Sequence, residues 1–106
     1  MKRGTIYWIN LDPTKGSEIK KKRPCVVVSA TPINKARRTV VVVPLSTAAK
    51  SNPPIVVSVQ CDNKDVVAVC DQVRTVDKSR FESKIGELSI KDMDKIDESL
   101  RVVLSL

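Results

Sequence analysis

The side chains that most enzymes use for proton transfer or metal binding are scarce in this sequence. Histidine is absent, which excludes Ser-His-Asp triads, Cys-His pairs and zinc sites with histidine ligands. The three cysteines, Cys25, Cys61 and Cys70, form no C-x-x-C pair and lie in or beside valine-rich runs. We predict that they are small buried thiols rather than nucleophiles, zinc ligands or disulfide partners. Arginine, lysine, carboxylate and hydroxyl groups remain as candidates for chemistry.

Positive charge is concentrated between residues 15 and 23. The segment Lys15–Arg23 holds four lysines and one arginine but a single acid, Glu18. Residues 1–50 carry 11 basic and 2 acidic side chains and residues 51–106 carry 8 and 10, so the excess behind the net charge of +7 lies in the first half. Polyanions are natural partners of such a surface. Because a charge run is often only solvated surface, composition alone leaves both interpretations open.

Other motifs with a known chemistry are missing. The sequence contains no G-x-x-x-x-G-K or G-x-G-x-x-G motif and no carboxylates at metal-site spacing, so we expect no metal and no cofactor. Met1–Arg3 is charged like the start of a signal peptide, but the apolar stretch Ile6–Ile9 ends at Asn10. We therefore expect no secretion signal and no membrane span, and unpaired cysteines favour a reducing, cytoplasmic setting.

The elements that must position these groups are mainly strands. A chain of 106 residues fits one domain, residues 1–106. β-Branched residues predict strands at Gly4–Leu11, Pro24–Ser29, Thr39–Leu45, Ile55–Gln60 and Val66–Cys70, with Gln72–Val76 as a continuation or a short sixth strand. Runs such as those in Thr39–Leu45 are too apolar for a strand with one wet face. We therefore expect a sheet that curls on itself.

Only the C-terminal segment is predicted to form a long helix. Ser89 can cap it, and apolar residues recur at helical spacing from Ile90 to Leu104. Its acids Asp92, Asp94, Asp97 and Glu98 are expected to form a solvated face near the helix N-terminus. A shorter helical turn is possible at Asp77–Phe81. Two long loops, from Asp12 to Arg23 and from Ser46 to Pro54, are the expected places for function.

Six segments of the chain resemble one family when they are taken in order. In the first half, Lys2–Gly4 leads into the first predicted strand, Leu11–Glu18 is LDPTKGSE, and Arg23 and Pro24 open a valine-rich strand. Further along the chain, Val42–Thr47 is VVPLST and Val69–Lys78 is VCDQVRTVDK, which contains a D-Q-x-R-x-x-D pattern. The last segment, Lys84–Leu88, is KIGEL. Together they cover nearly the whole chain. The sequence resembles the MazF/PemK family of toxin endoribonucleases, which are the toxins of type II toxin-antitoxin systems.

This resemblance implies both a fold and a function. The fold would be mainly β (α+β), a small SH3-like or CcdB-like β-barrel with a C-terminal α-helix, assembled as a twofold homodimer that compensates for a thin core. The activity would be metal-independent, sequence-selective cleavage of single-stranded mRNA. An RNA 2′-hydroxyl would attack the adjacent phosphate, leaving a cyclic phosphate and a free 5′-hydroxyl. The partner would be a cognate antitoxin with an acidic, partly disordered segment that covers Lys20–Arg23.

Site residues follow from the same resemblance. The implied catalytic residues are Arg23, Ser46, Glu18 and Asp71. Arg23 would hold the phosphate with its planar fork, Ser46 would contact the scissile phosphate, and Glu18 or Asp71 would accept the proton. The implied RNA-binding residues all have polar or basic side chains: Lys15, Ser17, Lys20, Lys21, Lys22, Thr47, Gln72 and Arg74.

Structural explanations compete with each of these roles. Arg23 could only solvate the end of the barrel, and the hydroxyls of Ser46 and Thr47 could bond their own turn. Glu18 and Asp71 could each be the partner of a nearby arginine, and Arg74 could pair with Asp71 or Asp77. At the level of the whole protein, the alternatives are a non-catalytic toxin of the same fold that binds DNA gyrase and a basic RNA-binding barrel without catalysis.

The sequence also departs from the family pattern. Some PemK-branch members have histidine where this chain has Ser17 and arginine where it has Val69, so a mechanism that uses those groups is unavailable. The glycine-containing stretch usual before Arg23 is replaced by Ile19–Lys22. Loss of glycine stiffens this loop, and the added charge should strengthen salt-sensitive backbone binding and loosen sequence choice.

Overall fold

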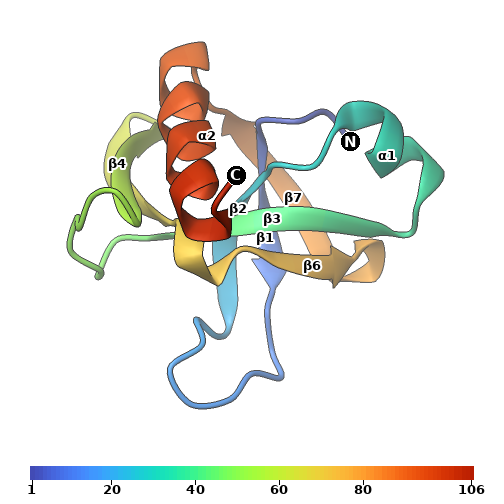
Figure 1. Cartoon of the computed structure of the whole chain (residues 1–106). Helices are drawn as coiled ribbons and strands as arrows, with labels where there is room; N and C mark the ends of the chain where they lie inside the picture. The colour runs from blue at the N-terminus through green and yellow to red at the C-terminus, as the bar shows by residue number, and fades with distance from the viewer.

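The computed structural model describes residues 1–106 and is dominated by antiparallel strands (Figure 1). The strands are β1 (Thr5–Asn10), β2 (Lys22–Val27), β3 (Thr39–Ser46), β4 (Val56–Cys61), β5 (Lys64–Val69), β6 (Arg74–Asp77) and β7 (Phe81–Glu87). Two α-helices, α1 (Thr31–Ala36) and α2 (Ile90–Leu104), and two 3₁₀ turns, η1 (Cys70–Gln72) and η2 (Lys78–Arg80), complete the chain. The fold is therefore the mainly β structure with a C-terminal helix that the sequence predicts.

Strand β3 organises the sheet. The strand order is β4-β5-β3-β2-β1-β7, and β6 also pairs with β3. Along one edge β3 pairs with β2, whereas its other edge pairs with β6 near its beginning and with β5 at its end. Because one strand serves two partners along the same edge, the sheet bends around β3, as expected for apolar strands with both faces covered.

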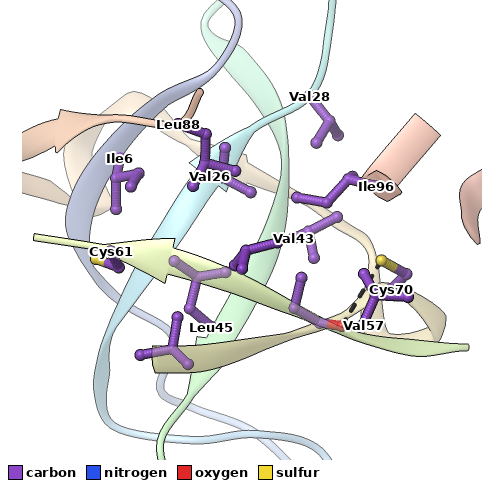
Figure 2. Packing of buried hydrophobic residues seen from close by; sticks show 13 residues of the cluster. Ile6, Val26, Val28, Val43, Leu45, Val57, Cys61, Cys70, Leu88 and Ile96 are labelled. Atoms are coloured by element: carbon purple, nitrogen blue, oxygen red, sulfur yellow. Dashed lines mark hydrogen bonds between the residues drawn. The ribbon is translucent and has the colours of Figure 1, made fainter. Parts of the chain in front are cut away.

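Alternation along the strands sorts the buried side chains into two clusters. The larger cluster contains Val26, Val43 and Leu45 and receives Ile96 from α2, which Figure 2 shows pointing from the helix toward Val43. The smaller cluster contains Cys25 and Val27, which are the alternate residues of β2, together with members of β1, β3 and β6. Strands β2 and β3 thus each contribute to two cores, which explains why their valine runs lack a polar face.

All three cysteines are free and buried, as predicted. Burial raises the pKa of the Cys25 thiol to about 12, although the neighbouring Arg74 guanidinium partly opposes that rise. Burial also raises the pKa values of Cys61 and Cys70. Because the thiolate is the reactive form, these thiols behave as apolar core groups rather than nucleophiles.

Helix α2 begins as predicted but uses one of its acids differently. The Ser89 hydroxyl accepts the N–H of Asp92 at 3.1 Å, which caps the helix. Asp92 is buried rather than solvated, because its carboxylate accepts the Gln60 N–H of β4 at 2.9 Å. Asp97 pairs with Arg3 near the N-terminus. The prediction of a fully solvated acidic face is therefore wrong for Asp92, which fastens α2 to the sheet.

Several predicted boundaries and elements differ from the structure. The predicted strands Val66–Cys70 and Gln72–Val76 are separated by η1, so β6 begins only at Arg74. Strand β2 begins at Lys22, before the predicted Pro24. The turn predicted near Asp77–Phe81 is present as η2.

Strand β7 and helix α1 have no counterpart among the predicted elements. Strand β7 was missed because it is an edge strand rich in Glu, Ser and Lys. Helix α1 was missed because it has only six residues, with a proline in its first turn. It is held by Asn34, whose buried amide donates to the carbonyls of Met1 and Ser29.

No helix in the structure has the length and apolar character needed to cross a membrane.

Candidate active site

Three polar side chains that lie far apart in the sequence share one end of the sheet. Residues 22 and 23 begin β2 and Ser46 ends β3, and these two ends adjoin because the strands run antiparallel with Cys25 opposite Pro44. By alternation Arg23 lies on the same face as Cys25, and Ser46 on the same face as Val42. Val42 lies opposite Arg74 of β6. Arg23, Ser46 and Arg74 therefore lie on the face of the smaller cluster.

Arg23 has the geometry of an available cation. Its Nε donates to the Lys20 carbonyl at 3.2 Å, which leaves the terminal N–H groups of the guanidinium without a protein acceptor. No carboxylate lies within 4.0 Å of it as an ion-pair partner. The residue is partly exposed, so its planar fork is accessible to an oxyanion from solvent.

Arg74 supports the loop rather than pairing with an acid. Its Nη1 donates to the Leu11 carbonyl at 3.3 Å. No ion pair joins it to Asp71 or Asp77, and Asp77 instead pairs with Arg38 at 3.7 Å. The predicted alternative of an Arg74 ion pair is therefore wrong, because the end of β1 lies closer to the guanidinium than either carboxylate does. The positive charge of Arg74 remains unneutralised beside Cys25.

Ser46 and Thr47 begin the second long loop. The Ser46 hydroxyl accepts the N–H groups of Ala48 at 3.2 Å and Ala49 at 3.1 Å, and the Thr47 side chain is exposed. This is the turn-stabilising role that the sequence left open as an alternative for Ser46. Both bonds use lone pairs of the oxygen, so the hydroxyl proton is still free to donate to a phosphate oxygen.

The first long loop runs from Asp12 to Lys21 and projects from the sheet between β1 and β2 (Figure 1). Its exposed side chains include Lys15, Ser17, Lys20 and Lys21, and Lys22 follows on β2 in an ion pair with Glu82 at 3.1 Å. Lys21 has a φ of 68°, a left-handed conformation that favours glycine. Glu18 closes a turn in the loop, because its Oε1 accepts the Lys15 N–H at 2.6 Å.

The two candidate bases flank one open cavity. A cavity of about 490 Å³ is lined by Ser17, Glu18, Asp71, Gln72, Val73 and Arg74. Asp71 is exposed and forms no ion pair, whereas Glu18 is already bonded within its loop. Gln72 spans the cavity, since its amide bonds the backbone of both Ile19 and Ser17. The structure thus brings both carboxylates to the cavity that Arg74 also lines.

Three residues that the sequence analysis did not single out hold the loop in place. Asp12 accepts the Lys21 N–H at 3.0 Å, and Arg80 donates to the carbonyls of Asn10 and Asp12. Ile19 packs against the smaller cluster. An isolated isoleucine within a lysine run is a signal that could have identified an anchor, whereas nothing local marks Arg80 as a partner of residues 68 and 70 positions away.

The arrangement offers cations, a hydroxyl and carboxylates without a metal-like cluster. No group of three or more cysteine, aspartate or glutamate side chains is placed to hold a metal ion. Arg23 and Ser46 do not line the cavity that holds the two carboxylates, and Arg74 is the cation that does. Guanidinium and hydroxyl donors are suited to binding a phosphate diester, and carboxylates are suited to moving a proton near it.

Comparison with known proteins places the chain in a family. The model of the PemK-like, MazF-like toxins of type II toxin-antitoxin systems matches residues 2–104. The chain belongs to the PemK/MazF toxin family. It is 35% identical over 112 residues to endoribonuclease EndoA of Bacillus subtilis, covering 100% of this chain and 96% of that protein. It is 32% identical over 115 residues to endoribonuclease MazF9 of Mycobacterium tuberculosis, covering 100% of this chain and 98% of that protein.

Solved structures of PemK/MazF toxins share the fold. A MazF structure from Deinococcus radiodurans matches with a TM-score of 0.89 at 23% identity, covering 100% of this chain and 97% of that one. An endoribonuclease from a mycobacterial species, solved in complex with its cognate antitoxin, matches with a TM-score of 0.84 at 24% identity and covers 100% and 96% of the two chains. The family and the barrel-plus-helix fold that the resemblance implied are both confirmed.

Proposed function

We propose that this PemK/MazF-family toxin is a metal-independent endoribonuclease that cleaves single-stranded mRNA at selected sequences. The observation that carries the proposal is the placement of Arg23, Ser46 and Arg74 on one face of the sheet, with Arg23 near the start of β2, Ser46 at the end of β3 and Arg74 at the start of β6. A module that only binds RNA needs positive charge but has no need for a hydroxyl donor at the phosphate. Relatives at 35% and 32% identity that are named endoribonucleases support the same activity.

The reaction uses a nucleophile from the substrate. The RNA 2′-hydroxyl oxygen attacks the adjacent phosphorus, the bond from phosphorus to the 5′-oxygen breaks, and a 2′,3′-cyclic phosphate and a 5′-hydroxyl result. A base takes the proton of the 2′-hydroxyl, and a donor protonates the departing 5′-oxygen. Negative charge grows on the phosphoryl oxygens in the transition state, so fixed donors there lower the barrier.

Each candidate residue fits one of these tasks. Arg23 stabilises the phosphoryl charge with its free N–H groups, and the Ser46 hydroxyl donates a further hydrogen bond to the same phosphate. Asp71 is the preferred base, because its carboxylate has no partner, while Glu18 is engaged with the Lys15 N–H. A guanidinium has no acceptor atom, so Arg23 is assigned to charge stabilisation and proton donation rather than to proton removal.

The exposed lysines extend the phosphate-binding surface beyond the reacting group. Lys15, Lys20 and Lys21 contact backbone phosphates on either side of the cleavage position, and Thr47 adds a hydroxyl. For a single strand each neutralised phosphate contributes a slope of about −0.7 to the dependence of log affinity on log salt concentration. Lys21→Gly keeps the left-handed turn and removes one charge, so the slope should become less steep by about 0.7.

A cognate antitoxin is the proposed regulator. Its acidic, partly disordered segment would lie across Lys20–Arg23 and compete with RNA for the same cations. A mycobacterial structural relative is known in complex with its cognate antitoxin, which supports this class of partner. We place both proteins in the cytoplasm, where mRNA is available to the toxin.

The active form is proposed to be a homodimer. Three apolar side chains near the C-terminus, Val102, Leu104 and Leu106, are between 51% and 86% exposed. Exposed apolar surface near one end of a helix is typical of an interface. Sedimentation velocity should give a mass of two chains, and Val102→Asp with Leu104→Asp should shift it to one chain.

The decisive experiment follows the products of cleavage. Purified toxin is incubated with a single-stranded RNA in excess EDTA, and new ends carrying a 5′-hydroxyl are ligated and sequenced. We expect cuts at a short recurring sequence, and replacement of the 2′-hydroxyl upstream of a cut by hydrogen should abolish that cut. If intact toxin produces no cuts while it inhibits DNA gyrase, the non-catalytic alternative is correct instead.

A further inference from the structure

The basic loop between β1 and β2 has a single apolar anchor. Ile19 is the one apolar side chain between Lys15 and Lys22, and it packs against the cluster that contains Ile9, Leu11 and Cys25. Lys20 and Lys21 follow it directly and are exposed. Adjacent side chains point in different directions, so packing Ile19 against the cluster leaves the neighbouring Lys20 facing solvent.

The backbone at this anchor is held by a side chain from the other end of the cavity. Gln72 of η1 accepts the Ile19 N–H through Oε1 at 2.7 Å and donates through Nε2 to the Ser17 carbonyl at 3.4 Å. One amide therefore satisfies a backbone donor and a backbone acceptor two residues apart. This complementarity ties the loop to a segment 53 residues away.

The ends of the loop are fixed by other contacts. Leu11 donates its N–H to the Lys21 carbonyl at 3.0 Å, and Asp12 accepts the Lys21 N–H at 3.0 Å. Between these points, Arg23 of β2 holds the Lys20 carbonyl through its Nε at 3.2 Å, whereas the bonds of Gln72 and the packing of Ile19 hold the backbone from Ser17 to Ile19. Loss of either of the last two contacts would leave the ends in place and release the segment that carries Lys15 and Ser17.

We propose that Gln72 and Ile19 form a latch that holds the basic loop in its RNA-binding position, so that Gln72 acts as a positioning residue rather than as a contact to RNA. This inference rests on the proposed function. A loop that is already ordered loses less conformational entropy when RNA binds, so the latch increases RNA affinity and leaves the chemical step nearly unchanged. Removing the latch should therefore raise KM and leave kcat nearly unchanged.

The test compares Gln72→Leu, Ile19→Ala and the double variant. Each single variant should raise KM for a short RNA substrate by about tenfold, which corresponds to ~1.4 kcal/mol, with kcat within about twofold. Because both residues act through the same loop, the double variant should be no worse than the more affected single variant. Hydrogen exchange at the Ile19 amide should accelerate in Gln72→Leu. Gln60→Leu, the same change at an exposed glutamine on β4, serves as the control and should match wild type.

Two outcomes would contradict the latch. If Gln72 contacts RNA directly, Gln72→Leu raises KM without faster exchange at Ile19, Ile19→Ala has no effect on KM, and the latch is wrong. If Gln72→Leu lowers kcat by more than about tenfold at unchanged KM, the side chain belongs to the chemical step and the latch is also wrong. A wild-type chain that shows no cleavage contradicts the proposed function, whereas the Ile19 exchange measurement still tests the latch by itself.

Discussion

At the scale of single residues, strand alternation places Arg23, Ser46 and Arg74 on one face of the sheet, and their hydrogen bonds distinguish their proposed roles. Both terminal nitrogens of Arg23 are free, because only its Nε is bonded to the backbone, whereas Arg74 uses its Nη1. Ser46 is partly committed to its own turn, and Arg74 donates to the Leu11 carbonyl. These differences rank Arg23 first for contact with the reacting phosphate.

Arg23→Ala should lower kcat by about 10²–10³, the range typical for removing one donor to a transition-state oxyanion. Arg23→Lys keeps the charge but loses the fork, so it should recover only part of the rate. Single-turnover cleavage of a fluorescent RNA measures both variants, with circular dichroism as the check on folding. A wild-type rate in folded Arg23→Ala would remove this residue from the site.

The choice of base is also decided at single residues. Asp71→Asn should lower kcat by about 10²–10⁴, the usual contribution of a general base. Glu18→Gln should reduce the rate far less, since an amide oxygen can still accept the Lys15 N–H. The opposite ranking, with Glu18→Gln the slower enzyme, would assign the proton transfer to Glu18.

At the scale of elements, helix α2 determines how the small sheet is covered. Ile96 inserts into the larger cluster, Asp92 bonds β4, and Ser99 donates to the carbonyls of Pro54 and Ile55 at the end of the second loop. The helix therefore fixes the segment that follows Ser46 as well as the core. Its stability is coupled to the shape of the site through these contacts.

Ser89→Ala should destabilise the fold by about 1 kcal/mol, because the Asp92 N–H loses its cap. Urea denaturation followed by circular dichroism measures the change in the free energy of unfolding. Ser83→Ala on the exposed edge strand β7 is the matched control and should fall within about 0.5 kcal/mol of wild type. Equal effects at both positions would mean that the cap contributes nothing.

At the scale of the whole molecule, the three buried thiols make the fold sensitive to alkaline pH. The folded state keeps Cys25 protonated because its pKa is raised from 9.0 to about 12, whereas the unfolded chain releases this proton near its ordinary value. The contribution is therefore complete below about pH 9 and is lost as pH rises toward 12.

The contribution of Cys25 to the free energy of unfolding should fall by about 1 kcal/mol between pH 8 and pH 10. Urea titrations at the two pH values measure it, and Cys25→Val, which removes the titrating group while keeping an apolar side chain, should reduce the fall. An identical pH dependence in wild type and Cys25→Val would show that Cys25 ionises equally in both states. Every other ionisable group is common to the two proteins, so its contribution cancels in the comparison.

Local patterns were sufficient for part of this molecule. Runs of valine predicted the strands around Thr39–Leu45, the spacing from Ser89 to Leu104 predicted α2 with its cap, and the valine-rich surroundings of the cysteines predicted their burial. These features depend on near neighbours in the sequence and on the periods of strands and helices. The order of motifs from Leu11 to Asp77 was sufficient for the family, which the comparison confirmed.

Tertiary structure alone decided which of these residues meet. Three hydrogen bonds show this, because each joins groups tens of residues apart. Asp92 accepts the Gln60 N–H, Arg74 donates to the Leu11 carbonyl instead of pairing with an acid, and Gln72 bonds Ile19, which is 53 residues away. Strand β7 exists because β1 offers it an edge, although its own residues are mostly polar. Such pairings depend on register and chain path, which no local pattern encodes, because their free energy arises only when both partners are already in place.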